Sequence, residues 1–226
     1  REATICAESE IKNESGKECT VYYEMEMTDA DGKAVRFKNG KTVCRSEEMK
    51  LAPGATCTMR TSGRAGELHF WSWGYGYLYT VKTRIMRDGK CIDETTTRTG
   101  FRKTEFGQGK VWLNGRVMQM KGYAQRTSNE WPGVGMSVPA WLSDYSNALM
   151  VESGANLVRW MHVTPWKQDV ESCDRVGLIQ AMPAGDSERD VNDRRWEQRC
   201  MLMRDAIIYN RNNPSIVFYE CGNKGI

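Results

Sequence analysis

Two side chains that could take part in acid–base or ion-pair chemistry lie in two short apolar segments. Arg159 belongs to the segment 156–161 and Glu220 to the segment 215–221. Both segments are bounded by turn or helix-stop residues, which predicts buried strands. A carboxylic acid in an apolar site can stay protonated, so Glu220 is a candidate acid, and a paired charge inside the fold is the alternative. The guanidinium fork of Arg159 can hold a carboxylate or orient a nucleophile, or it can pair with Glu220 itself.

The charge distribution excludes two classes of partner. The 226 residues carry 32 Lys and Arg against 29 Asp and Glu, a formal charge of +3, and the charges are interspersed. Nucleic-acid binders concentrate basic residues, and a membrane-spanning helix needs about 20 apolar residues, far more than the run 216–219 supplies. We therefore expect no nucleic-acid partner and no membrane span.

Metal and cofactor sites are also not expected. The chain has eight cysteines and two histidines, His69 and His162, and no C-x-x-C pair. A structural zinc site needs such clustered ligands. No glycine-rich phosphate-binding motif follows any candidate strand, so no nucleotide cofactor is expected. We expect mostly free thiols, with Cys173 and Cys200 buried on apolar helical stripes.

Residues 1–105 have the pattern of an antiparallel β domain. The segment 21–27 alternates before the turn residues 29–33, and the segment 77–85 alternates before the turn residues 87–90. Turn signals at this spacing leave room for about seven strands, which is typical of a β-sandwich of immunoglobulin-like type.

Residues 106–226 change to a helical period. Asn114-Gly115 lies between two apolar runs and predicts a tight hairpin. After it, three apolar stripes predict helices, each followed by a short apolar run. The stripes are Leu142, Tyr145 and Leu149 between Pro139 and Gly154; Val170, Cys173 and Val176 from about Trp166 to Gly177; and Trp196, Cys200, Met203 and Ile207 before Asn213-Pro214.

This alternation of strands and helices requires a parallel sheet with right-handed crossovers. A doubly wound sheet and a TIM-type barrel both satisfy it. A (β/α)8 barrel takes roughly 250 residues, so the segment 106–226 corresponds to about half of one.

Taken together, the two halves resemble glycoside hydrolase family 2, in which an immunoglobulin-like sandwich precedes a catalytic barrel. The resemblance covers nearly the whole chain, and its motifs occur in the family's order. They are Phe70-Trp71-Ser72, Tyr77-Leu78-Tyr79-Thr80, Thr99-Gly100-Phe101-Arg102, Leu113-Asn114-Gly115-Arg116 with Lys121-Gly122, Asn156-Leu157-Val158-Arg159-Trp160-Met161-His162 with Pro165, Cys173-Asp174-Arg175-Val176-Gly177-Leu178, and Arg211-Asn212-Asn213-Pro214-Ser215-Ile216.

The resemblance implies retaining hydrolysis of a β-glycosidic bond, with one Glu after the fourth barrel strand as acid/base and another, much later, as nucleophile. Such carboxyl groups lie about 5 Å apart. Where the family has Gly-Asn-Glu, this chain has Gly222-Asn223-Lys224. Lysine has an ordinary pKa near 10.4 and is a poor proton donor at neutral pH. We expect this chain, which lacks the nucleophile, to be inactive by itself.

The resemblance also implies sugar-binding residues. Asn223 matches the family's ligand for the sugar 2-hydroxyl. The other candidates are Arg159, His162 and the stacking platforms Trp160, Trp166 and Trp131. Two further departures are Gln125, near a family histidine, and Ala181-Met182-Pro183, in place of an acidic strand end.

Two alternatives belong to other classes of protein. Lys224 favours a non-catalytic carbohydrate-binding or scaffold protein derived from the family. In the other alternative, the sandwich alone acts as an interaction module. The expected partner is a carbohydrate, and a homo-oligomer remains open.

Overall fold

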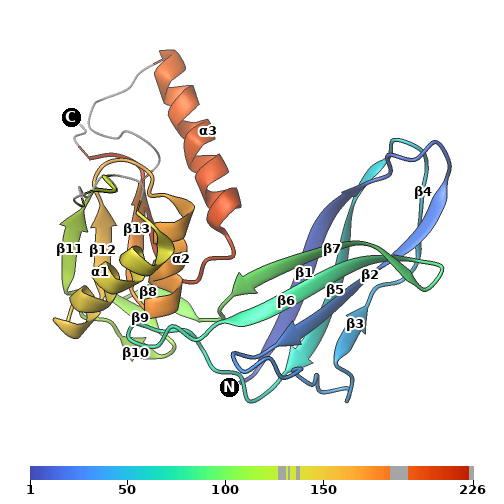
Figure 1. The fold of residues 1–226 in the computed structure, drawn as a ribbon, viewed down its shortest axis with the longest axis horizontal. Coiled ribbons are helices and arrows are strands. Elements are labelled where there is room, and N and C mark those ends of the chain that lie inside the picture. The colour runs from blue at the N-terminus through green and yellow to red at the C-terminus, as the bar shows by residue number, and fades with distance from the viewer. Residues whose placement is uncertain (127–130, 132, 136–137, 184–192, 224–226) are drawn as a thin grey trace. The chain divides into compact units, whose positions relative to one another are not determined.

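The computed structural model describes residues 1–126, 131, 133–135, 138–183 and 193–223. Their contacts divide the chain into two units, which are Arg1–His69 with Tyr79–Arg98 and Phe70–Leu78 with Thr99–Ile226 (Figure 1). The segment Phe70–Leu78 therefore belongs to the second unit, although it comes from within the range expected for the sandwich.

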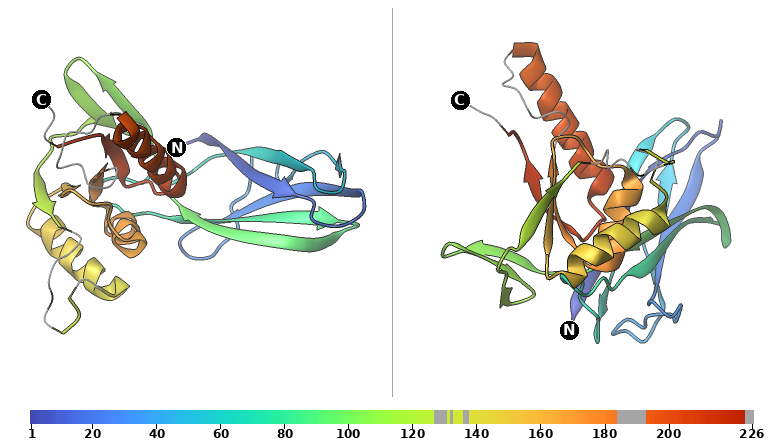
Figure 2. Two further views of the ribbon diagram at one scale, coloured as in Figure 1. Left: turned by 90° about the horizontal axis from the view of Figure 1, so that it is seen from above. Right: turned by 60° about the vertical axis from the view of Figure 1, so that its left-hand side comes forward.

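The first unit contains the seven strands that the turn spacing predicts. They are β1 (Ala3–Lys12), β2 (Cys19–Thr28), β3 (Val43–Arg45), β4 (Met49–Leu51), β5 (Thr56–Ala65), β6 (Tyr79–Arg87) and β7 (Lys90–Thr99). β1 pairs with β5 in one layer, and β3, β2, β6 and β7 form the other in that order, with β4 on β2. Figure 2 shows the two layers of this sandwich.

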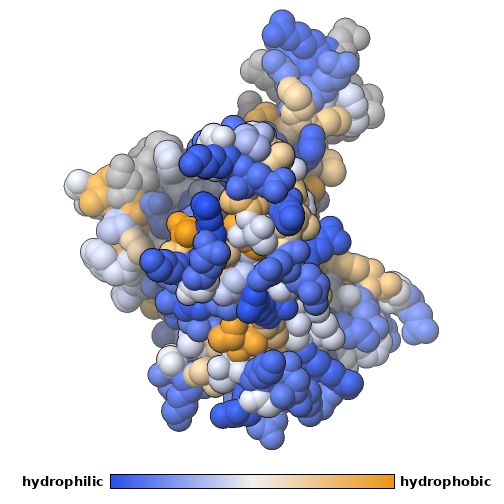
Figure 3. Space-filling view, turned by 90° about the vertical axis from the view of Figure 1, so that its right-hand side faces the viewer, coloured by the Kyte–Doolittle hydropathy of each residue, from blue (hydrophilic) through white to orange (hydrophobic). Residues whose placement is uncertain are grey.

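The core of the sandwich follows the alternation seen in the sequence. On β2, Val21, Tyr23, Met25 and Met27 are buried. Since successive strand residues point to opposite faces, these four form one apolar face, as predicted. Figure 3 shows charged and polar residues covering most of the surface in view, with small apolar areas between them.

After the segment Phe70–Leu78, the second unit continues with the predicted hairpin. β8 (Thr104–Gly107), β9 (Lys110–Leu113) and β10 (Arg116–Val117) pair in the order β10-β9-β8. Asn114 and Gly115 both have positive φ, 53° and 79°, which is the backbone of a two-residue hairpin turn. The side chain of Asn114 is also held at both ends, because Oδ1 accepts from the backbone nitrogen of Lys103 at 2.9 Å and Nδ2 donates to the carbonyl of Trp71 at 2.9 Å.

A four-stranded parallel sheet follows. β11 (Gly122–Gln125), β12 (Leu157–Trp160), β13 (Ile179–Pro183) and β14 (Ile216–Glu220) are neighbours in sequence order. A doubly wound sheet reverses its strand order at a switch point, and these four strands do not. The sheet thus fits part of a TIM barrel better than the doubly wound alternative.

Three helices connect these strands. They are α1 (Ala140–Glu152), α2 (Lys167–Val176) and α3 (Asp193–Asn210). α2 ends at Gly177, which has a φ of 74° and donates its backbone N–H to the carbonyl of Cys173, so the predicted glycine stop is confirmed. Cys173 packs against Val158 and Trp160 of β12, which places α2 on one face of the sheet.

The opposite face of the sheet has its own core. Trp71 and Leu78, from the segment Phe70–Leu78, pack with Leu113, Met118 and Ile179. The ring of Trp71 is fully buried, and its nitrogen donates to the carbonyl of Asp174 at 2.8 Å. This segment is therefore part of the second unit by packing as well as by hydrogen bonding.

The apolar stripes predicted for two helices are not buried in the described structure. On α1, Tyr145 and Leu149 are 56% and 44% exposed, and the helix instead buries Leu142, Ser143 and Asn147. On α3, Trp196, Cys200 and Ile207 are exposed and Met203 is half-buried. The expected burial of Cys200 is therefore wrong, because no described element covers that side of the helix.

The cysteines are free thiols in the structure, and Cys173 is buried as expected. Among the described helices, none has both the length and the apolar composition that crossing a bilayer needs.

Candidate functional site

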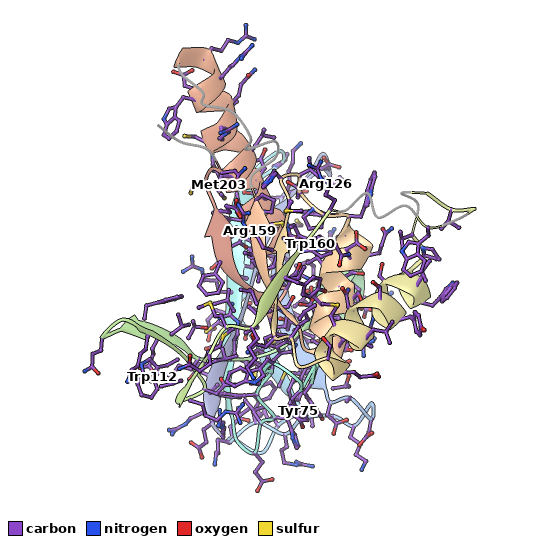
Figure 4. All side chains as sticks on the ribbon, turned by 90° about the vertical axis from the view of Figure 1, so that its left-hand side faces the viewer. Tyr75, Trp112, Arg126, Arg159, Trp160 and Met203 are labelled. Carbon is purple, nitrogen blue, oxygen red and sulfur yellow. The ribbon has the colours of Figure 1, made fainter. Side chains whose placement is uncertain are left out.

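The two faces of β12 carry different chemistry. Val158 and Trp160 point to the helix side, where they pack with Cys173 and Leu178. Since side chains alternate along a strand, Arg159 points to the other side. Figure 4 shows Arg159 and Trp160 on opposite sides of this strand.

The register of the sheet brings Glu220 to the face of Arg159. Arg159 pairs with Ala181 on β13, and two residues farther along β13, Pro183 pairs with Glu220 on β14. A displacement of two residues keeps a side chain on the same face. Arg159 and Glu220 therefore meet although they are 61 positions apart in the chain.

Their contact is a two-pronged ion pair. Nε of Arg159 donates to Oε2 of Glu220 at 2.8 Å, and Nη2 donates to Oε1. The side chains are 37% and 14% exposed. The hydrogen bond with Glu220 raises the pKa of Arg159 above its usual value, so the guanidinium is charged. The predicted alternative, an internal ion pair, is thus confirmed.

Two more predicted residues join this pair. Nη2 of Arg159 also donates to Oδ1 of Asn223 at 3.0 Å. Nδ2 of Asn223 lies 3.4 Å from Nε2 of His162, which follows β12. Arg159, Glu220, Asn223 and His162 therefore form one polar cluster at the carboxyl ends of β12 and β14. Lys224 lies outside the described residues.

The tryptophans fall in three different settings. Trp160 is fully buried, and its ring nitrogen donates to Oε1 of Gln180 at 2.8 Å, so it has no free face and the expected stacking role is wrong. Trp166 precedes α2 at the carboxyl end of β12 and is 53% exposed. Trp131 is partly buried and bridges to Gly135. Of the three, Trp166 presents the most open ring.

The residues that depart from the family pattern contribute little to this cluster. Gln125 pairs in register with Trp160 and so points to the helix side of the sheet. Ala181 and Pro183 share the face of Arg159 but offer no side-chain donor or acceptor.

A second polar cluster behind the sheet was not predicted. Gln180 donates to Ser215, and Asp174 accepts from Ser215 and from Nδ2 of Asn213 at 2.6 Å. Burial raises the pKa of Asp174 to about 6, against the hydrogen bonds from Asn213 and Ser215, which lower it. This cluster fixes the start of β14. Its sequence signal is weak, since polar residues within apolar runs are more often exposed.

The described residues offer no group of His, Cys, Asp and Glu side chains that could hold a metal ion. A cavity of about 350 Å³ lies elsewhere, beside Lys121 and Asn156, which precede β11 and β12. It is therefore at the amino end of the strands, opposite the Arg159 cluster. Barrel enzymes place their chemistry at the carboxyl ends, which favours the Arg159 cluster as the functional site.

Comparison with known proteins matches both parts of the chain to models of one family. Residues 1–102 match the model described as glycosyl hydrolases family 2, and residues 104–226 match the model of its TIM barrel domain. A β-glucuronidase of Formosa agariphila is 30% identical over 99% of this chain, which covers 22% of that protein. The β-galactosidase BoGH2A of Bacteroides ovatus is 26% identical over 99% of this chain, which covers 26% of that protein.

Solved structures give the same result. A β-glucuronidase from glycoside hydrolase family 2 superimposes with a TM-score of 0.87 at 30% identity, covering 98% of this chain and 23% of its own. A putative β-galactosidase from Bacteroides fragilis gives 0.83 at 27% identity, covering 99% of this chain and 32% of its own. The chain thus spans about a quarter of the length of the curated relatives it matches.

Proposed function

Because the chain belongs to glycosyl hydrolases family 2, we propose that it carries the immunoglobulin-like sandwich, residues 1–105, and the first half of the barrel, residues 106–226, of a retaining β-glycoside hydrolase. Its substrate is a carbohydrate with a β-linked sugar. The names of the relatives make β-glucuronides and β-galactosides the first candidates.

One observation carries this proposal. Arg159, Glu220, Asn223 and His162 converge on the same face of the sheet, at the strand ends where barrel enzymes bind substrate. In this arrangement an amide, an imidazole and a guanidinium line one site. Such groups recognise hydroxyls through hydrogen bonds, and we assign Asn223 to the sugar 2-hydroxyl and His162 to a neighbouring hydroxyl.

The described residues supply sugar contacts but not the full hydrolytic machinery. Retaining hydrolysis needs an acid/base and a nucleophilic carboxylate about 5 Å apart. Glu220 is engaged as the acceptor of two hydrogen bonds from Arg159, and protonation would break one of them, so we do not assign it the role of acid. We therefore place the nucleophile outside the described residues and expect this chain alone to be inactive.

Lys224 stands at the family's acid/base position. An ordinary lysine holds its proton too tightly to give it to a leaving group at neutral pH. General acid–base catalysis contributes about 10²- to 10⁴-fold, so the protein with lysine here hydrolyses β-glycosides slowly.

The test is hydrolysis of chromogenic β-glucuronides and β-galactosides by the protein in the length in which its source produces it. Its intact mass, measured first, shows whether it extends past Ile226. Lys224→Glu should raise kcat/KM by about 100-fold or more. Lys110→Glu, an exposed lysine on β9, is the matched control and should change nothing.

The second candidate, a non-catalytic carbohydrate-binding protein, is favoured by Lys224 itself. It requires that the protein bind a β-glycoside without turnover and that Lys224→Glu leave turnover absent. Measurable hydrolysis by the unaltered protein would exclude it.

A further inference from the structure

We propose that Glu220 is a positioning residue, which acts through Arg159 to orient the amide of Asn223 so that its nitrogen, rather than its oxygen, faces the sugar. The inference rests on the proposed function for the identity of the ligand. Its structural part depends only on the contacts among these three residues and His162.

Arg159 determines which atom of the Asn223 amide faces it. A guanidinium has donors only, so the atom that it contacts at 3.0 Å must be the amide oxygen of Asn223. The amide nitrogen is then forced to the opposite side, where it lies 3.4 Å from Nε2 of His162. The orientation of this amide is therefore set by the charge of its neighbour.

Glu220 in turn orients the guanidinium of Arg159. Its side chain is 37% exposed, and a long flexible side chain in that setting has several accessible rotamers. Glu220 is 14% exposed, sits on a strand and accepts from both Nε and Nη2. Two parallel hydrogen bonds fix both the position and the plane of a guanidinium. With one hydrogen of Nη2 on Glu220, the second is directed at Asn223.

His162 lies on the other side of the Asn223 amide. Nδ2 of Asn223 can only donate, so Nε2 of His162 must accept. In this arrangement Nε2 carries no hydrogen, and the ring hydrogen is on Nδ1. Donor and acceptor roles thus run in one direction from Glu220 through Arg159 and Asn223 to His162, and the remaining N–H of Asn223 is left to donate to a sugar oxygen.

The test compares a β-glycoside with its 2-deoxy analogue, using calorimetric dissociation constants for the protein in its natural length. Loss of one hydrogen bond to the sugar should weaken binding about tenfold in the unaltered protein. The dissociation constant of the 2-deoxy analogue divided by that of the glycoside should therefore be about ten. In Glu220→Gln, which keeps the shape but removes the charge, this ratio should fall to about one. A purely structural defect would weaken binding of both sugars equally and leave the ratio at its original value, which would overturn the inference.

Two further variants serve as a control and as an independent test. Asp144→Asn is the matched control, because Asp144 holds Arg175 in a similar two-pronged pair between α1 and α2 and should not affect the ratio. Asn223→Leu removes both the donor and the acceptor of this side chain, so it should abolish the ratio even if Glu220→Gln does not fold. A ratio preserved in Asn223→Leu would also overturn the inference.

A second measurement is independent of any sugar. The chain has two histidines, so nitrogen NMR of protein labelled in histidine can follow the ring of His162, assigned by its loss in His162→Gln, with His69 as internal reference. We expect the Nδ1-protonated form in the unaltered protein and a mixture in Glu220→Gln. If no glycoside binds but this change occurs, the proposed function fails and the structural part of the inference, the orientation of the Asn223 amide, holds. If sugars bind with an unchanged ratio and the ring signal does not move, the inference fails and the proposed function holds.

Discussion

Trp160 and Gln180, on neighbouring strands, are joined by a hydrogen bond of 2.8 Å in the layer between the sheet and its helices. Neither residue has any exposed surface. The amide nitrogen of Gln180 also donates to the carbonyl of Val170 at 3.1 Å and to Oγ of Ser215 at 2.6 Å. One side chain therefore links β12, α2 and the start of β14 directly behind the candidate site.

Gln180→Leu should destabilise the protein strongly. The substitution preserves volume but leaves the buried ring nitrogen of Trp160 and the hydroxyl of Ser215 without this partner. Ser215 keeps its hydrogen bond to Asp174, whereas the ring nitrogen of Trp160 loses its acceptor. An unsatisfied buried group costs about 1–3 kcal/mol, so we expect a loss of about 2 kcal/mol in the free energy of unfolding. Urea unfolding followed by tryptophan fluorescence measures it. Gln119→Leu, at an exposed position, should change the midpoint little, and a similar midpoint for both variants would contradict the role given to Gln180.

Asp174 should make the protein less stable as pH rises from about 4 to about 6. Its pKa is raised from 3.8 to about 6 in the folded state, so in this window the folded state binds more protons than the unfolded state. Stability is then highest at the acid side and falls by up to roughly 3 kcal/mol across the window. In Asp174→Asn this decrease of the free energy of unfolding with pH should vanish. In Asp205→Asn, at an exposed site on α3, the decrease should remain. Equal slopes in the two variants would show that Asp174 does not titrate in this way.

Gly177→Ala should be much more damaging than Gly154→Ala. Both glycines have positive φ, 74° and 91°, so both variants carry backbone strain of about 1–2 kcal/mol. At Gly177 an added Cβ would also lie 2.7 Å from the backbone nitrogen of Tyr75, while at Gly154 it would meet nothing within 4 Å. We expect the midpoint of urea unfolding to shift at least twice as far for Gly177→Ala. Equal shifts would mean that the loop around Tyr75 moves away at little cost.

Trp166 has the most exposed ring of the three candidate stacking platforms. Trp166→Ala should weaken glycoside binding about tenfold, because a sugar face would lose its contact with an exposed ring. Trp141 is 69% exposed on α1 and serves as the control. Calorimetric titration of both variants decides the point, and an unchanged dissociation constant for Trp166→Ala would remove it from the site.

Much of the second unit could be predicted from the sequence because its signals are local. The hairpin at Asn114-Gly115, the stop of α2 at Gly177 and the strand around Arg159 all follow from residue types at fixed spacing. The pairing of Arg159 with Glu220 was predicted only as an alternative, because the register between two strands cannot be derived from the sequence of either strand alone.

The errors have a common physical cause. A strand covered on both faces is apolar throughout, so the sequence around Trp160 does not show which face points to the helices. The stripe with Cys200 on α3 has the right period but no described element to cover it. Gln180 and Asp174 were missed because a buried polar residue is recognisable only from its partners.

The turn at Asn114 and Gly115 links the chemical lifetime of this protein to its folding. An asparagine before glycine is prone to deamidation, because the small glycine lets its backbone nitrogen attack the side-chain carbonyl. In the folded chain that carbonyl and its amide nitrogen are both engaged, with Lys103 and Trp71. The attack requires these bonds to open. Folded molecules are therefore protected from deamidation at Asn114, and deamidation proceeds through the unfolded fraction.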